Sequence, residues 1–348
     1  MPSLDIFNAN AFSMMSLTNA IETAPYKPRM LGELGIFKEV PIRTQLAWVE
    51  KKNNILRVLN TANRGSVEDV RSTTPRTAYP IPVPHVPYFQ TILADDVQNI
   101  RQFGSETELE SVASHVNDQL EAMKQDHEVT SEWHRIGALK GIVYDGDGVT
   151  EIVNLFTKFG LSQTVLNWYT TDDSFAPHVT AIIRNIANKL GSESFKQIIA
   201  LCGDDYFDNV VKHSSMTTAY ERWRDGEFLR MSHLGPAWYS LAAAGFQYQN
   251  VLFVNYRGVI GSLEFIESDT AYCFPTGVDD MFEEVVAPAD FMETVNTKGK
   301  RWYARQAFLE FMKGVKLHTQ SNILALNKRP DAVVKSVWAE SSSSSSSA

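Results

Sequence analysis

Cysteine is scarce in this chain, long apolar runs are absent, and basic residues do not outnumber acidic ones. The two cysteines, Cys202 and Cys273, have no CxxC spacing, which argues against a disulfide framework and against a thiolate zinc site. No apolar run approaches the roughly 18 residues of a membrane helix, and no basic segment followed by an apolar one opens the chain. We therefore expect no membrane span, no export signal and a reducing compartment.

The charge balance limits the partners that the chain can bind. With 32 Lys and Arg against 41 Asp and Glu, the net charge is −9, which argues against a surface that wraps nucleic acid by neutralising phosphates. Any contact with DNA is expected to be loose. The composition, 44% hydrophobic and 21% charged, is that of a folded protein, and 348 residues are enough for two hydrophobic cores.

Motifs for catalysis and for cofactor binding are also missing. The chain contains no Gly-x-Ser-x-Gly motif, no Walker loop and no Gly-x-Gly-x-x-Gly between a strand and a helix. His127, Glu128 and His134 share one stretch, but His-Glu-x-x-His is absent and the two histidines are seven residues apart, so we place them on a helix surface. The sequence therefore predicts no catalytic residue, no metal ligand and no cofactor.

A calcium loop at Asp145 and Asp147 fails on its spacing. Gly148 comes two places too early, and Val149 stands where such a loop needs an oxygen ligand. The Asp-Gly-Asp-Gly run instead predicts a turn, flanked by strands before it and after it, and therefore a β-hairpin.

Two charged stretches leave alternatives open. Residues 222–227 form either a solvated loop after a helix or a contact with a partner. Residues 298–311 combine four aromatic with four basic residues, which is compatible with a nucleic-acid surface and equally with packing and an interface. We favour packing and an interface for the second stretch.

One long helix is predicted over residues 105–136, and it sets the scale of the molecule. Ser105 opens a capping box at its start. Apolar residues then recur at spacings of three and four as far as Met123, after which the next lies six residues on, so the buried face turns or the helix bends. Gly137 and Gly141 are expected to end it. At about 1.5 Å per residue the helix is on the order of 48 Å long, which indicates an elongated molecule.

The chain before this helix has no core of its own. Residues 1–32 contain two short apolar patches and predict an arm. The runs 42–48 and 55–59 predict the strands of a β-hairpin that turns at 51–54; a lone hairpin is marginally stable, so a neighbouring subunit is expected to support it. Residues 79–88 carry proline at alternate positions and predict an extended, polyproline-like strap.

Shorter helices and strands alternate from about 160 to 270, as expected of a compact α+β domain. Helices are predicted at 177–190, 206–211 and 215–223, and strands at 195–202, 249–256 and 268–274. Residues 315–338 alternate apolar with polar residues and are expected to return to the sheet that begins at 141. The seven serines and Ala348 at the end bring no apolar surface and are expected to be disordered.

Three strings in the C-terminal part resemble a known family: residues 271–277 (Ala-Tyr-Cys-Phe-Pro-Thr-Gly), 287–297 and 314–322. Residues 101–107, which open the long helix, and 137–141, which close it, resemble the same family. The similarity runs from about 20 to 335. The family is that of the major capsid proteins of tailed bacteriophages, typified by the phage lambda head protein.

The resemblance implies a Hong Kong 97-like capsid fold of class α+β. It assigns 1–32 to an N-terminal arm, 33–90 to an extended loop with the hairpin and the proline strap, 91–159 to a peripheral domain with a spine helix at 105–136, 160–270 to an axial domain, 271–340 to a return into the peripheral domain, and 341–348 to a serine tail. The serine tail is a departure from the family.

The resemblance also implies a structural function. Many copies would self-associate into hexamers and pentamers and close an icosahedral head shell around packaged DNA. The implied partners are other copies of the chain, a portal, a scaffold and a decoration protein, with DNA held loosely and no membrane. The implied location is the virion, after synthesis in the host cytoplasm. Two rival hypotheses are a ring- or tube-forming tail or connector component and a soluble α+β enzyme whose site is assembled from scattered residues.

The hairpin carries the residues expected at the contact between subunits. They are its apolar members, Ile42, Leu46, Trp48, Ile55 and Leu59. We expect them to face a neighbouring copy because an isolated hairpin has no core in which to bury them.

Overall fold

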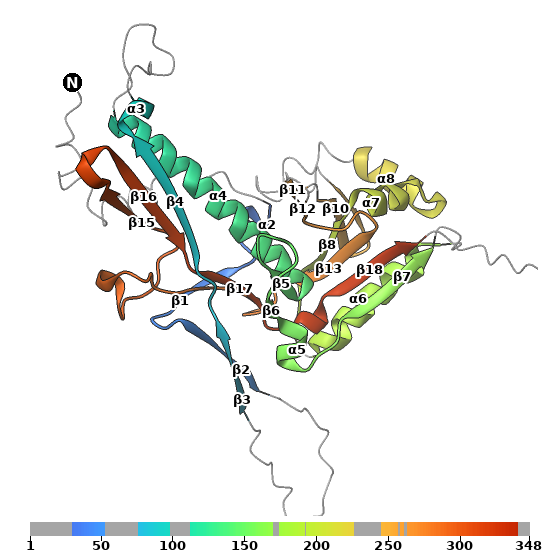
Figure 1. The fold of residues 1–348 in the computed structure, drawn as a ribbon. Coiled ribbons are helices and arrows are strands. Elements are labelled where there is room, and N and C mark those ends of the chain that lie inside the picture. The colour runs from blue at the N-terminus through green and yellow to red at the C-terminus, as the bar shows by residue number, and fades with distance from the viewer. Residues whose placement is uncertain are drawn as a thin grey trace, which may run out of the picture.

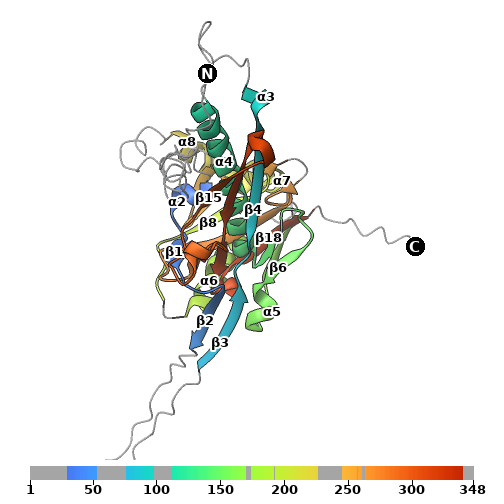
Figure 2. The same cartoon turned by 60° about the vertical axis from the view of Figure 1, so that its left-hand side comes forward.

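The computed structural model describes residues 30–52, 76–97, 112–169, 174–191, 193–225, 245–256, 258–260 and 263–339. Within these ranges helices and sheets are mixed along the chain, which confirms the predicted α+β class. Figure 1 shows a broad sheet with helices on the right, a long helix beside a narrower sheet on the left, and a two-stranded ribbon that projects below both. Figure 2 shows that the ribbon extends away from the rest of the molecule in a second view as well.

The broad sheet has six strands in the order β7-β18-β13-β8-β10-β9. Its strands are β7 (Thr164–Tyr169), β8 (Gln197–Cys202), β9 (Gly245–Tyr248), β10 (Val251–Asn255), β13 (Thr270–Thr276) and β18 (Val334–Ala339), and its helices are α6 (Ala176–Leu190), α7 (Asp204–Lys212) and α8 (Ser214–Asp225). The sheet and these helices share one hydrophobic core and are called the body below. The helices and strands predicted between 160 and 270 are confirmed, with bounds shifted by at most two residues.

Helix α6 forms because its apolar residues recur on a single face. Val179, Ile182, Ile186 and Leu190 are spaced three or four apart, and all four are buried in the core of the body. The helix stops at Gly191, which adopts a positive φ of 66° and donates its N–H to the carbonyl of Ala187. The apolar spacing and the glycine at its end therefore both favour a helix over the same residues.

The long helix α4 (Val112–Lys140) lies between the body and the narrower sheet. Its predicted start at Ser105 lies outside the described residues. Its end differs from the prediction, because Gly137 lies inside the helix, where an added Cβ would come within 2.9 Å of the Ile142 carbonyl oxygen. Gly141 follows the last turn with a φ of 90°. One glycine thus allows close packing, and only the other ends the helix.

The narrower sheet consists of β15 (Tyr303–Phe308), β16 (Gly314–Ser321) and β4 (Val86–Leu93), all antiparallel. We call it the peripheral sheet. One face packs on α4 through a small core, whose buried members are Ile92, Val116, Leu120, Met123, Trp302, Ala304, Val315 and Leu317. The short helix α3 (Ala94–Val97) follows β4. Because α4 covers only one face, the other face is open at Phe89, although Ala289 and Phe291 of a loop cover it at Tyr303.

A third sheet joins the N-terminal segment to the middle of the molecule. Helix α2 (Met30–Leu34) leads into β1 (Lys38–Pro41), which pairs in parallel with β14 (Phe282–Val286), and β14 pairs with β17 (Ile323–Asn327). Beyond β1 the chain enters the projecting ribbon of β2 (Leu46–Lys52) and β3 (Arg76–Pro82).

The ribbon corrects the predicted hairpin. Strand β2 continues through Lys51 and Lys52, where the turn was expected, and its partner is β3 rather than residues 55–59, which lie outside the described residues. Part of the expected proline strap is therefore a strand. Pro80 and Pro82 fit there because they alternate with Ile81, and β3 pairs only with β2 among the described strands, so the missing N–H groups fall on an edge.

The remaining elements are short. Strands β5 (Ile142–Tyr144) and β6 (Glu151–Asn154) confirm the hairpin predicted around the Asp-Gly-Asp-Gly turn. The others are α5 (Leu155–Phe159), β11 (Val259–Ile260), β12 (Leu263–Glu264) and the 3₁₀ turns η3 (Met292–Thr294), η4 (Glu310–Met312) and η5 (Pro330–Ala332).

The C-terminal strands do not return to the sheet that begins at 141, so that prediction is wrong. Strand β16 enters the peripheral sheet, β17 pairs with β14, and β18 lies between β7 and β13 in the body. Alternating polarity identified these strands but not their partners, because three different half-buried sheets accept the same pattern. No helix in the described part of the chain is long and apolar enough to cross a membrane.

Candidate assembly interface and its buried ion network

The projecting ribbon has two unlike faces. Ala47, Val49 and Ile81 are buried in a core that includes Val143 and Leu324. The alternate residues Leu46 and Trp48 point the other way and are 42% and 62% exposed. Since successive side chains of a strand point to opposite faces, burying one set leaves the other set outside. The ribbon is therefore anchored to its own chain and presents an apolar face to something else.

The predicted contact residues fall into three groups. Leu46 and Trp48 lie on the exposed face. Ile42 is partly buried and packs against the core beneath the ribbon, so it is an anchor in its own chain. Ile55 and Leu59 lie outside the described residues. Ala47 lies between the two exposed residues, and its small side chain fits the buried face.

Further exposed apolar side chains lie around the peripheral sheet. Phe89 lies on its open face, Met292 and Val295 on the loop after β14, and Phe311 at the turn between β15 and β16. Phe311 is 89% exposed and has a positive φ of 58°, which is uncommon for a bulky residue. Phe89 is shielded in part, because His318 stacks on its ring at 4.2 Å and the Lys316 ammonium lies 4.4 Å from the ring centre.

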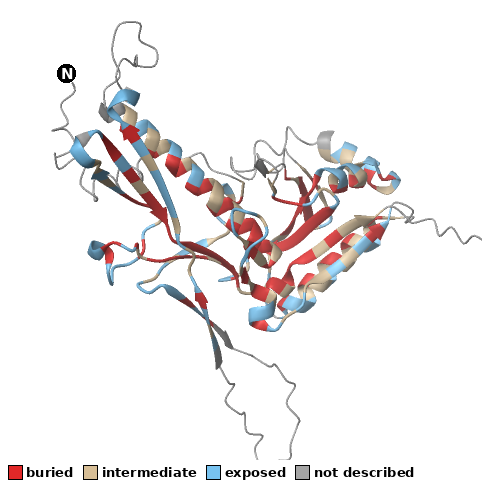
Figure 3. Cartoon of the chain, viewed as in Figure 1, coloured by how far each residue is buried: buried red, intermediate tan, exposed pale blue. Residues whose placement is uncertain are grey.

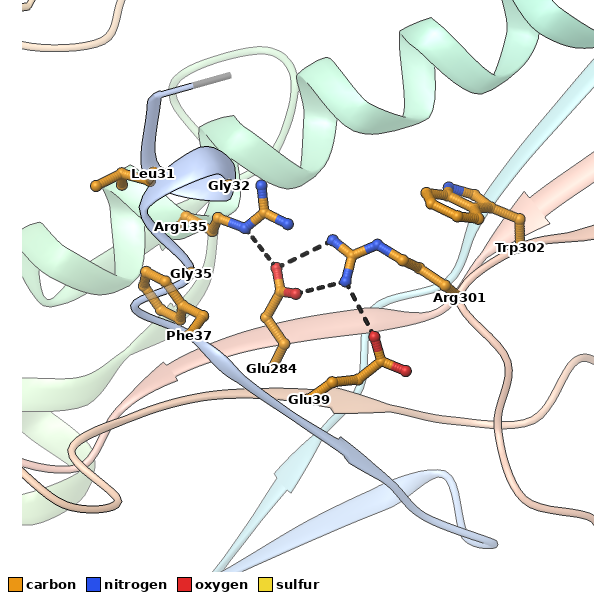
Figure 4. Close-up of a pocket in the computed structure, with 9 residues that line it drawn as sticks. All are labelled: Leu31, Gly32, Gly35, Phe37, Glu39, Arg135, Glu284, Arg301 and Trp302. Atoms are coloured by element: carbon orange, nitrogen blue, oxygen red, sulfur yellow. Dashed lines mark hydrogen bonds and ion pairs between the residues drawn. The ribbon is translucent and has the colours of Figure 1, made fainter. Parts of the chain in front are cut away.

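A buried network of charged residues joins four segments of the chain (Figure 4). Glu284 on β14 is at its centre. Its Oε1 accepts a hydrogen bond from Arg135 Nε at 2.6 Å, and its Oε2 accepts one from Arg301 Nη1 at 2.6 Å. Burial raises the pKa of Glu284, but the charges of Arg301 and Arg135 outweigh it, so the pKa is lowered overall. The carboxylate stays ionised because both guanidiniums face it.

The network continues from each arginine to further carboxylates. Arg135 Nη1 donates to Glu132 Oε2 at 3.0 Å. Arg301 Nη1 also lies 3.3 Å from Glu39 Oε2, and its Nε lies 3.6 Å from Glu128 Oε1. Helix α4, the N-terminal segment, β14 and the loop before β15 are thereby joined. A buried network of this kind adds little net stability, since desolvation offsets most of the attraction.

A cavity of about 250 Å³ lies beside this network. Its lining comes from the N-terminal segment on one side and the ion network on the other, and consists of Leu31, Gly32, Gly35, Phe37, Glu39, Arg135, Glu284, Arg301 and Trp302. The arginines in this lining are paired with carboxylates across short distances, so the cavity is a packing space at a junction of segments.

His127 and His134 of α4 are buried, which corrects their predicted place on a helix surface. His127, Glu128 and His134 are each at most 4% exposed. His127 Nε2 lies 3.0 Å from Thr319 Oγ1 under the peripheral sheet, and burial, together with His318, lowers its pKa to about 4. Burial also lowers the pKa of His134 to about 4, although Asp145 and Glu284 act in the opposite direction. Both side chains are therefore neutral near pH 7.

These residues show what the break in the apolar stripe of α4 meant. The buried face continues beyond Met123 with the same helical spacing but with polar and charged residues, namely Lys124, His127, Glu128, Ser131, Glu132 and Arg135. The sequence signal was present as a period of three and four in polar residues. It was missed because charged residues on a helix are expected to face water.

The other candidate residues have structural surroundings. The Asp145–Gly148 segment is a turn, in which Asp147 Oδ1 accepts the N–H groups of Val149 and Thr150. Both cysteines are free and buried, and burial raises the pKa of each thiol, to about 12 for Cys273. Across the described ranges, no group of His, Cys, Asp or Glu side chains is arranged to hold a metal ion.

The structure also describes most of the two charged stretches, 222–227 and 298–311. Of 222–227, the first four residues belong to the end of α8, and the rest lies outside the described residues. In 298–311, Trp302 and Tyr303 are buried and Arg301 belongs to the ion network, which fits the favoured interpretation of packing.

Comparison with known proteins identifies the family. A family model described as phage major capsid protein E matches residues 13–337. The chain belongs to this family. It is a phage major capsid protein, and the resemblance drawn from the strings at 271–322 is confirmed.

Curated relatives agree over nearly the whole chain. The major capsid protein of Pseudomonas phage KPP10 is 22% identical over 342 residues, covering 94% of this chain and 97% of the relative. That of Salmonella phage Felix O1 is 24% identical over 366 residues, covering 93% and 95%.

Solved capsid structures share the fold. A putative prophage capsid protein of E. coli CFT073 is 12% identical and gives a TM-score of 0.56, covering 94% of this chain and 99% of that one. The mature capsid of bacteriophage PhiM1 is 11% identical with a TM-score of 0.52, covering 90% and 88%. The expected Hong Kong 97-like capsid fold is thereby confirmed for this phage capsid protein.

Proposed function

We propose that many copies of this chain associate through hexamers and pentamers into the icosahedral head shell of a tailed phage, around packaged DNA. The ribbon of β2 and β3 is the observation that carries the proposal. A projecting two-stranded ribbon is marginally stable alone, and this one is anchored by one face while its other face exposes Leu46 and Trp48. A neighbouring copy would cover that face, and repeating such a head-to-tail contact around a ring closes the ring.

In this proposal the chain works by association and performs no catalysis. Its largest buried group of charges, centred on Glu284, joins segments of its own fold. The acidic balance, a net charge of −9, is suited to a lining that holds DNA loosely. The assembled chain would belong to the virion, after synthesis in the host cytoplasm. A portal, a scaffold and a decoration protein are the further partners to test.

The test compares the two faces of one strand. Replacing Leu46 and Trp48 together by serine removes the exposed apolar face, worth roughly 1.5 to 3 kcal/mol for each side chain at every contact once buried. Particle formation, followed by sedimentation and electron microscopy, should fail. Thermal unfolding of dissociated subunits should stay close to wild type, because neither side chain belongs to a core within the subunit.

The matched control is Val49→Ser on the buried face of the same strand. It should lower subunit stability directly, because it leaves a cavity and a buried hydroxyl. If the Leu46 and Trp48 changes unfold the subunit as severely as Val49→Ser, or leave closed shells intact, the ribbon is not the contact between copies. Tubes, open rings or monomers at high concentration from the unaltered protein would contradict the proposed closed shell.

A further inference from the structure

Helix α2 is held against α4 by a carboxylate that acts as its N-terminal cap. Glu132 Oε1 accepts the N–H of Leu31 at 2.8 Å, and Glu132 Oε2 accepts the N–H of Gly32 at 3.3 Å. These are early N–H groups of the helix, which have no partner inside it. The negative charge also suits the positive end of the helix dipole. A residue a hundred positions away thus supplies the cap that the local sequence, with Arg29 before Met30, does not.

Glu132 keeps partners of its own if α2 moves away. Arg135 Nη1 donates to its Oε2 at 3.0 Å, and the Tyr256 hydroxyl lies 3.4 Å from its Oε1. Arg135 is in turn paired with Glu284. Loss of the two α2 bonds would therefore not leave an unpaired charge in the interior, which is the usual obstacle to breaking a buried ionic contact.

Helix α2 is followed by Gly35, whose N–H donates to the Gly32 carbonyl at 3.2 Å. Gly35 has a positive φ of 58°, and an added Cβ would meet no atom within 4 Å, so space does not explain the glycine. The residues beyond it are fixed separately: Phe37 packs on Phe282 with ring centres 5.2 Å apart, and Lys38 to Pro41 pair with β14. Gly32 and Gly35 both line the cavity of about 250 Å³.

We propose that α2 is a latch with two positions, docked on Glu132 or released by rotation at Gly35. Leu31 is the fully buried residue of α2, and Met30 and Leu34 pack partly buried against the same core. The docked position therefore depends on these side chains and on the two bonds to Glu132. Because α2 is the described element nearest the N-terminus, its position sets where residues 1–29 begin their course. A subunit that must fit several environments gains an adjustable exit for this segment.

The latch is a property of the subunit and does not depend on shell formation. The test is hydrogen–deuterium exchange, read by mass spectrometry on dissociated subunits. In the wild type, the amides of Leu31 to Leu34 should exchange faster than those in the last two turns of α4, because the latch opens without global unfolding.

Two variants should shift the latch toward release by different routes. Glu132→Gln exchanges charged acceptors for a neutral one, and Gly35→Ala disfavours the positive φ of the docked form. Each should speed exchange at Leu31 to Leu34 about tenfold, the ratio that corresponds to roughly 1.4 kcal/mol. Gly35→Ala should leave exchange in α4 unchanged, since it does not touch the ion network.

Gly160→Ala is the matched control. Gly160 also has a positive φ, 62°, with no atom within 4 Å of an added Cβ, but it caps α5. Faster exchange of Leu31 to Leu34 in this variant would refute a specific pivot at Gly35. If these amides exchange only with those of α4, in the wild type and in both latch variants, α2 is a fixed part of the core and the proposal is wrong.

Discussion

The body and the peripheral sheet bury their apolar residues to different extents. In the body, helices α6, α7 and α8 pack against a six-stranded sheet whose central strands are almost wholly buried, and its exposed large apolar residues lie on the edge strand β7. The peripheral sheet is covered by α4 on one face, and large apolar side chains remain exposed on it and on the adjoining ribbon. In Figure 3 the central strands of the body are almost entirely red, whereas red alternates with tan and pale blue along the peripheral sheet.

The contrast shows which region buries its apolar surface within the subunit and which region leaves apolar surface exposed. A sheet with helices packed on it has little to gain from a neighbour, whereas a sheet with one open face gains by burying it. The buried ion network joins α4, β14 and the loop before β15 through Glu284 and its arginines. Stability within the subunit and association between subunits are thereby assigned to different parts of one chain.

The largest expected effect comes from phenylalanine-to-alanine changes in the two regions. Phe253 is fully buried in the body and packs on Phe246 with ring centres 5.3 Å apart. Phe253→Ala should lower the free energy of unfolding by about 3 to 5 kcal/mol, through lost burial and the cavity left behind. Urea unfolding of dissociated subunits measures it.

The control in the other region is Phe89→Ala. Phe89 is 50% exposed on the open face of the peripheral sheet, so its loss should cost at most about 1 kcal/mol in the isolated subunit. Equal costs at the two positions would mean that the peripheral sheet is as complete as the body, and the contrast between them would fail.

The same contrast explains which parts of the fold could be predicted from sequence. Helix α6 followed from the spacing of Val179, Ile182, Ile186 and Leu190, because one apolar face against a core is a local pattern. The partner of β2 could not be predicted from the sequence, because β3 begins after more than 20 intervening residues. The polar residues 51–54 instead suggested a turn to a nearer strand. Strand pairing across such a distance is not encoded in either strand alone.

The candidate site divides in the same way. Leu46 and Trp48 were found because they are large apolar residues in a stretch with no local core. Glu132, Arg135, Glu284 and Arg301 were missed because a charged residue gives no sign in isolation that it is buried. Their burial depends on partners from distant segments, which only the assembled fold brings within 3 Å.

Acid should weaken the packing of α4, by less per side chain than the loss of Phe253 weakens the body. His127 and His134 have pKa values of about 4 when folded, against about 6.5 in an unfolded chain, so the unfolded state binds more protons between these values. The free energy of unfolding should therefore fall as the pH drops from 6.5 to 4. The shift corresponds to about 3 kcal/mol for each histidine if it is fully realised. Urea unfolding at pH 7, 5.5 and 4.5 measures the slope.

His127→Gln isolates the share of this acid sensitivity that arises where α4 packs on the peripheral sheet. The neighbours of His127 are Thr319 and Tyr88 on that sheet and His318 on its open face. The glutamine amide can still form a hydrogen bond with Thr319, but it does not take up a proton. The variant should have a shallower slope between pH 6.5 and 4. A slope identical to wild type would show that His127 does not contribute to the acid sensitivity.

The smallest expected effect is the removal of Glu340 to Ala348. Strand β18 ends at Ala339, whose partner on β7 is Tyr169, so this truncation takes no residue from the ladder of the body. The serine run contributes no apolar side chain that could be buried. Thermal unfolding and particle yield should both equal wild type.

A longer truncation that begins at Val334 is the contrasting case, since β18 lies between β7 and β13 and its loss would expose both neighbours. That variant should fail to fold, because the six-stranded sheet would be divided. If the short truncation lowers the unfolding temperature, the body is not complete at Ala339. If it abolishes particles while the unfolding temperature holds, the serine segment itself takes part in association, and association would then not be confined to the peripheral sheet and the ribbon.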